Sequence, residues 1–115
     1  MLDNGYIMEL FELNCKELGK NSQRLDNEEI SFLLKKVPGW HLVKNNISIE
    51  KKYIFPNFNE SLYFINQVSS ICESENHHPD ILFGWGYAKI NIYSHFLGGL
   101  HKNDFIIASK IDNIK

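Results

Sequence analysis

Cysteine is scarce in this sequence, and long apolar runs and an excess of positive charge are absent. Cys15 and Cys72 are too few for a disulfide framework, and neither belongs to a C-x-x-C pair of the kind that binds metal. The apolar runs extend over only a few residues, so we expect no transmembrane span. These absences together predict a cytoplasmic protein with two reduced thiols.

The charge gives no reason to expect a polyanionic partner. Twelve basic residues are scattered among fourteen acidic ones, and the formal net charge is −2. Because no basic stripe is present, we expect neither direct contact with nucleic acid nor binding to an anionic membrane. Residues 1–12 carry Asp3, Glu9 and Glu12 and no basic segment, so a secretory signal is not expected either.

The length and the apolar content predict one compact domain. The chain has 115 residues, of which 43% are hydrophobic, enough to form a core. Residues 1–25 lack a clean periodicity and are interpreted as an N-terminal arm with at most one short helix. Residues 26–115 are interpreted as the domain proper.

Capping residues and apolar periodicity divide the domain into seven elements. Asp26 with Glu29, and Asn57 with Glu60, have the spacing of helix caps. The helix after Asn57 has one apolar stripe, which consists of Phe58, Leu62, Ile65, Val68 and Cys72. The expected order is a helix from 26, strands 40–43 and 47–54, a helix from 57, strands 81–83 and 87–95, and a helix starting at 101–104. This order favours an α+β two-layer sandwich, with helices on one face of a four-stranded antiparallel sheet.

The richest chemical signal is a group of histidines. Three of the five, His77, His78 and His95, lie within nineteen residues. Imidazole titrates near neutrality, so such a group can supply both an acid and a base. His78 precedes Pro79 and is therefore held extended, whereas His95 ends a strand away from its apolar face. This spacing favours a shared site.

Other interpretations of these residues remain open. Each histidine alone is compatible with a surface or structural role, and three imidazoles can also bind zinc. Asp104 either caps the last helix or acts indirectly at the site. The aromatic side chains near the histidines either pack in strands or stack on a planar heterocycle; they are Phe83, Trp85 and Tyr93. His41 and His101 are interpreted as surface residues.

The pattern as a whole resembles the signature of the pterin-4a-carbinolamine dehydratases. It begins with Glu73-x-x-x-His77-His78-Pro79 and continues through Trp85, His95 and Asp104. The likeness spans roughly residues 26–112. Flanking motifs extend it, namely Val37-Pro-Gly-Trp40, Phe55-x-Asn57-Phe58 and Gly98-Gly-Leu-x-x-Asn-Asp104-Phe.

The resemblance implies a homodimer or homotetramer that removes water from 4a-hydroxytetrahydropterin without a metal or other cofactor. The product is a quinonoid dihydropterin, and the reaction recycles tetrahydrobiopterin. His77 and His95 would form the acid–base pair, and His78 would orient the pterin. The expected substrate-binding residues are Asn76, His77, His78, Pro79, Tyr93, Ser94, His95 and Phe96.

Some residues depart from the family pattern, and two other functions stay open. Phe96 replaces a polar or acidic residue, Tyr93 replaces a smaller one, and His101 stands where a serine or threonine usually caps the last helix. One alternative function is a protein-binding module that acts as a dimerisation cofactor of a transcription factor. The other is a pterin-binding protein of another pterin pathway.

Overall fold

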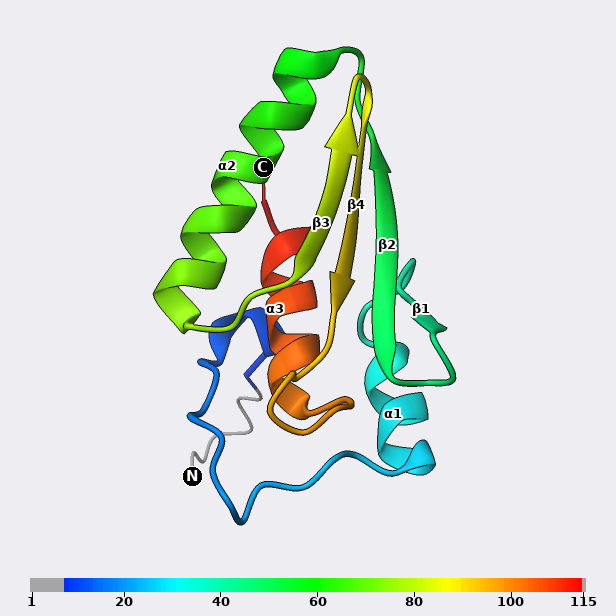
Figure 1. Ribbon diagram of the computed structural model, residues 1–115, viewed down its shortest axis with the longest axis vertical. Helices are drawn as coiled ribbons and strands as arrows, with labels where there is room; N and C mark the ends of the chain where they lie inside the picture. The colour runs from blue at the N-terminus through cyan, green and yellow to red at the C-terminus, as the bar shows by residue number, and fades with distance from the viewer. Residues whose placement is uncertain (1–7, 115) are drawn as a thin grey trace.

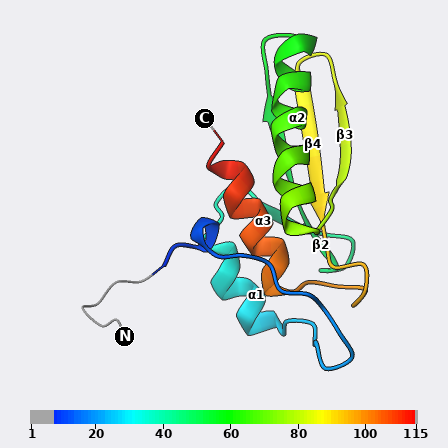
Figure 2. The same cartoon turned by 90° about the vertical axis from the view of Figure 1, so that its left-hand side faces the viewer.

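Three α-helices lie on the same side of a four-stranded antiparallel sheet whose strand order is β1-β2-β4-β3 (Figures 1 and 2). The structure is a computed structural model that describes residues 8–114. The predicted α+β sandwich is confirmed. The elements are η1 (Leu10–Glu12), α1 (Asn27–Leu34), β1 (His41–Val43), β2 (Ser48–Ile54), α2 (Phe58–Glu75), β3 (Asp80–Gly84), β4 (Tyr87–Ile92) and α3 (Lys102–Asp112).

The predicted helix caps explain where α1 and α2 begin. The Asp26 carboxylate accepts the backbone N–H of Glu29 at 2.8 Å, and the Glu29 carboxylate accepts that of Asp26 at 2.9 Å. This reciprocal pair satisfies two N–H groups that have no partner within α1. The Asn57 side chain accepts the backbone N–H of Glu60 at 2.9 Å and starts α2 in the same manner.

The core lies between the sheet and the helices. In β4, Ala88, Ile90 and Ile92 alternate with polar residues and are fully buried, and Ile92 pairs with Ile49 of β2. Helices α2 and α3 cover this face with further buried side chains, among them Val68, Cys72, Phe105, Ile107 and Ile111.

Three predictions about these elements are wrong in detail. The buried residues of α2 are Ser61, Phe64, Val68 and Cys72, so Phe58 and Leu62 of the predicted stripe, which are 44% and 38% exposed, do not belong to the buried face. Ile47 precedes β2 and is also exposed. The last strand ends at Ile92, not His95.

The early end of β4 has a clear cause. The chain reverses direction after Ser94. The Ser94 N–H donates to the Gly99 carbonyl at 2.9 Å, and the Ser94 carbonyl accepts from the Leu97 N–H at 3.0 Å. His95 therefore lies in a turn. It is not constrained by the alternation of a strand.

The arm packs on the domain. Its short η1 segment contacts α3 and buries Leu10. The chain then runs past the first turn of α3, and the Leu25 N–H donates to the Leu100 carbonyl at 2.9 Å (Figure 2). The first seven residues of the predicted arm, and Lys115, lie outside the described residues.

The C-terminal end of α3 is tied to the sheet through Asp112. This carboxylate accepts from the Trp40 indole at 3.0 Å, from the Lys51 ammonium at 2.8 Å and from the Tyr53 hydroxyl. Burial, together with the hydrogen bond to Asp112, raises the pKa of Tyr53 far above its usual range, so the phenol stays a donor. These contacts fix the position of the helix that carries Asp104.

Residues 8–114 contain no helix with the length and apolar character that a membrane crossing requires.

Candidate active site

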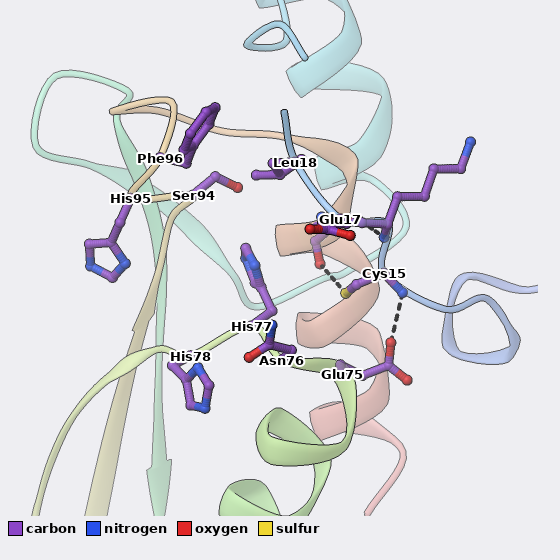
Figure 3. Close-up of a pocket in the computed structure, with 12 residues that line it drawn as sticks. Cys15, Glu17, Leu18, Glu75, Asn76, His77, His78, Ser94, His95 and Phe96 are labelled. Carbon is purple, nitrogen blue, oxygen red and sulfur yellow. Dashed lines mark hydrogen bonds between the residues drawn. The ribbon is translucent and has the colours of Figure 1, made fainter. Parts of the chain in front are cut away.

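A hollow of about 600 Å³ lies where the arm, the end of α2, the turn after β4 and the start of α3 meet (Figure 3). The predicted histidines His77, His78 and His95 all line it. The complete lining is formed by residues 15–18, 75–78 and 94–96, with Asn103. Segments from near both ends of the chain therefore share one cavity with the corner after α2.

The end of α2 positions the histidine pair. Asn76 adopts a left-handed conformation with φ of 53°. Its N–H donates to the Glu73 carbonyl, and the N–H of His77 donates to the Cys72 carbonyl at 3.1 Å. This pairing is the Schellman helix ending, which requires a left-handed residue that asparagine tolerates better than most. The backbone of His77 is thereby fixed at the edge of the hollow.

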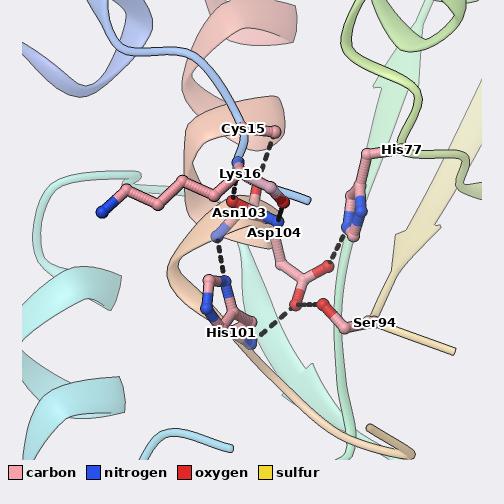
Figure 4. A network of polar contacts seen from close by, with 7 residues as sticks. All are labelled: Cys15, Lys16, His77, Ser94, His101, Asn103 and Asp104. Carbon is pink, nitrogen blue, oxygen red and sulfur yellow. Dashed lines mark hydrogen bonds and ion pairs between the residues drawn. The ribbon is translucent and has the colours of Figure 1, made fainter. Parts of the chain in front are cut away.

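A buried carboxylate holds the His77 ring. Asp104, in the first turn of α3, has no solvent exposure. Its Oδ1 lies 2.6 Å from Nε2 of His77, while Oδ2 accepts from the Ser94 hydroxyl at 2.9 Å and from the His101 N–H at 2.8 Å (Figure 4). Asp104 therefore both caps α3 and contacts a histidine of the site.

This network assigns the tautomer of His77. An ionised carboxylate can accept from all three groups at once, so the His77 proton that faces Asp104 belongs on Nε2. No described residue forms a hydrogen bond with the other ring nitrogen, Nδ1 of His77. The neutral ring therefore has a free acceptor, and its side chain lines the hollow.

The other two imidazoles are more open to solvent. His78 pairs with Glu73, and both side chains are more than half exposed, so this contact contributes little stability. His95 is exposed on its turn, and its ring lies 4.1 Å from the Tyr93 ring, centroid to centroid. The three rings thus differ in environment although they share one cavity.

The structure brings together six of the eight expected substrate-binding residues. Asn76, His77, His78, Ser94, His95 and Phe96 line the hollow, whereas Pro79 and Tyr93 do not. Trp85 is 71% exposed at the β3–β4 turn, and Phe83 packs against Phe58 with ring centroids 5.6 Å apart. Neither of these two aromatic side chains lines the hollow.

Sequence reasoning missed one feature of the site: residues 15–18 form part of its wall, and no local pattern in the arm indicated this. His101 stands at the position that usually caps the last helix, and it does cap α3, since its Nδ1 accepts the Asn103 N–H at 3.0 Å. The His101 side chain is partly exposed. Within residues 8–114, no three His, Cys, Asp or Glu side chains are grouped so that they could hold a metal ion.

We predict that Asn76→Gly folds as well as the parent chain, whereas Asn76→Val loses about 1–2 kcal/mol of unfolding free energy. Glycine adopts the left-handed conformation without strain, but a β-branched side chain does not. Urea unfolding of both variants measures the difference. Equal stability of the two variants would contradict the assigned helix ending.

We predict that His101 makes the fold less stable as the pH falls below neutrality. Burial lowers the pKa of His101, and the nearby Asp104 opposes this while His77, Lys16 and Lys102 reinforce it. In the unfolded chain, His101 therefore binds its proton near the usual histidine pKa of about 6.5. In the folded chain it binds the proton only at a lower pH. The free energy of unfolding should decrease as the pH falls through that value.

The variant His101→Asn isolates this effect, because asparagine caps a helix without titrating. Urea unfolding at about pH 7.5 and about pH 5.5 should show a smaller loss of stability for the variant than for the parent chain. The same loss in both would rule out His101 as a source of the pH dependence.

Comparison with known proteins identifies the family. Residues 23–114 match the sequence model of the pterin 4 alpha carbinolamine dehydratases. A relative from Rubrobacter xylanophilus is 39% identical over 106 residues, covering 92% of this chain and 98% of the relative. One from Vibrio cholerae is 41% identical over 105 residues, covering 90% and 96%. Both carry the provisional name pterin-4-alpha-carbinolamine dehydratase.

Two solved structures share the fold. The first is a transcriptional coactivator/pterin dehydratase from Brucella melitensis, with a TM-score of 0.75 and 23% identity, covering 78% of this chain and 96% of that one. The second is a pterin dehydratase-like RuBisCO assembly factor of the alpha-carboxysome, with a TM-score of 0.57 and 20% identity, covering 64% and 86%. By its match over residues 23–114 and its relatives, this chain belongs to the pterin 4 alpha carbinolamine dehydratase family.

Proposed function

We propose that this protein removes water from a 4a-hydroxytetrahydropterin to give the quinonoid dihydropterin, and so recycles tetrahydrobiopterin. The family supports a pterin substrate. The observation that carries the proposal is the chain of contacts from Ser94 through Asp104 to His77, which ends at the hollow that His78 and His95 also line.

The reaction needs one acid and one base. The bond between C4a and the hydroxyl oxygen breaks as that oxygen receives a proton and leaves as water. The proton on N5 departs, and its electron pair forms the N5–C4a double bond. Nothing is oxidised or reduced overall, so two imidazoles in opposite protonation states suffice for the step.

His77 is the proposed base. Its Nε2 is occupied by Asp104 at 2.6 Å, which leaves Nδ1 to accept the proton from N5. The positive charge that then develops on the ring is stabilised by the adjacent carboxylate, as in a serine protease triad. Asp104 acts through His77 and is therefore a positioning residue.

His95 is the proposed acid. Its exposed turn allows the ring to recover a proton from water after each turnover. His78, paired with Glu73, is proposed to orient the pterin at the rim. The proposal also includes a homodimer or homotetramer as the oligomeric state and the cytoplasm as the location.

A protein-binding role is the second candidate. Two structural neighbours are described as a coactivator and as an assembly factor. Several large apolar side chains are also exposed on this chain, including Phe58, Tyr63 and Trp85. A binding role of this kind would not depend on the imidazole of His95.

We predict that His77→Ala and His95→Ala each lower kcat for dehydration by about a hundredfold or more, since each removes a proton-transfer group. Freshly generated 4a-hydroxytetrahydropterin is the substrate, and spontaneous dehydration is subtracted. Asp104→Asn should also lower kcat, because an amide can bind the wrong tautomer of His77.

The matched control for these variants is His41→Ala, which removes an exposed imidazole from β1, outside the hollow. Its rate should equal that of the parent chain. Full activity in the folded His77→Ala variant would refute the proposed mechanism, and absence of turnover in the parent chain would refute the proposed function.

A further inference from the structure

The arm is held against the site by a buried amide. The Lys16 N–H donates to Asn103 Oδ1 at 2.9 Å, and Asn103 Nδ2 donates to the Lys16 carbonyl at 2.8 Å (Figure 4). Asn103 is 2% exposed and precedes Asp104 in α3. Both backbone polar groups of Lys16 are thereby satisfied by one rigidly placed side chain.

A second attachment lies one residue earlier. The Cys15 N–H donates to Glu75 Oε1 at 2.7 Å, and Oε2 of the same carboxylate is 3.7 Å from the Lys110 ammonium. Glu75 ends α2 and Asn103 lies at the start of α3. Residues 15 and 16 are therefore bound to the same helix ends that place His77 and Asp104.

These attachments place the next two residues of the arm at the hollow. Glu17 and Leu18 line it, across from His78 and His95 (Figure 3). Glu17 and Glu75 are the two carboxylates in the lining, and Glu75 is already bonded to the arm. The Glu17 carboxylate has no hydrogen bond or ion pair with another residue among 8–114, so both its oxygens can accept from a ligand.

We propose that Glu17 recognises the donor edge of the substrate and that Asn103 is the positioning residue that holds it there. This inference rests on the proposed pterin substrate. A pterin presents its 2-amino group and its N3–H side by side, as two parallel donors. A carboxylate offers two parallel acceptors, and charge-assisted bidentate contacts of this kind are among the stronger hydrogen bonds. Leu18 adds an apolar contact beside them.

The test compares Glu17→Gln with Glu28→Gln. Both variants remove one exposed negative charge, but Glu28 lies on α1 away from the hollow. Binding of a stable reduced pterin, and of the same compound without its 2-amino group, is measured by calorimetry. KM and kcat for dehydration are measured in parallel.

The parent chain and Glu28→Gln should prefer the 2-amino compound by about tenfold, the value expected for one good hydrogen-bonded contact. Glu17→Gln should lose most of this preference and raise KM by a similar factor, with kcat unchanged. An unchanged preference in Glu17→Gln would overturn the inference while leaving the dehydratase function intact. A parent chain that binds pterin but does not accelerate dehydration would overturn the function alone.

Asn103→Ala tests the positioning role through Cys15. Burial and the nearby Glu75 raise the pKa of the Cys15 thiol to about 12, and Sγ lies 3.6 Å from the Asn103 carbonyl. Release of the arm should let Cys15 react with a thiol reagent at about pH 8 while the buried Cys72 stays protected, and KM should rise more than kcat falls.

Unchanged labelling and KM in a folded Asn103→Ala variant would overturn the role of Asn103. Labelling of both cysteines would show that this variant has unfolded. Asn103→Asp then tests the positioning role in its place, because it keeps an acceptor for the Lys16 N–H and removes the donor to the Lys16 carbonyl. Unchanged Cys15 labelling and KM in that variant would overturn the role of Asn103. Glu17→Gln decides the recognition role separately, because the Glu17 side chain is exposed and its replacement does not threaten the fold.

Discussion

The buried carboxylate of Asp104 is the constraint on which the site depends. A fully desolvated negative charge is costly unless donors surround it, and here the donors are the His77 ring, the Ser94 hydroxyl and the His101 N–H. Its place in the first turn of α3 adds the favourable end of the helix dipole. Because the donors belong to separate segments, burying this one group ties the corner after α2, the turn after β4 and the start of α3 together.

Helix α3 connects Asp104 to the arm at one end and to the sheet at the other. At its first turn, Asn103 binds the arm beside the residue that binds His77. At its last turn, Asp112 accepts from Trp40, just before β1, and from Lys51 of β2. A helix held at both ends places the arm and the His77 ring next to each other, as a preorganised site requires.

Much of this structure was predictable because its signals are local. The caps at Asp26 and Asn57 involve residues that are three positions apart. The close spacing of the three histidines favoured a shared site, and all three line one cavity. The arm wall was not predictable, since Lys16 and Asn103 are 87 residues apart and nothing in either neighbourhood indicates the pairing. The end of β4 was missed because apolar alternation does not reveal the turn that Ser94 closes with Gly99.

The tautomer of His77 tests the arrangement most directly, because the proposed transfer of the N5 proton to Nδ1 depends on it. Nitrogen-15 NMR of the ring nitrogens, in the parent chain at neutral pH, reports which nitrogen carries the proton. The buried carboxylate predicts a protonated Nε2 and an unprotonated Nδ1 on this ring, which lines the hollow. A neutral ring with its proton on Nδ1 would contradict the account. The one acceptor of that ring would be Nε2, which lies against Asp104, so no ring nitrogen could accept a proton from the substrate.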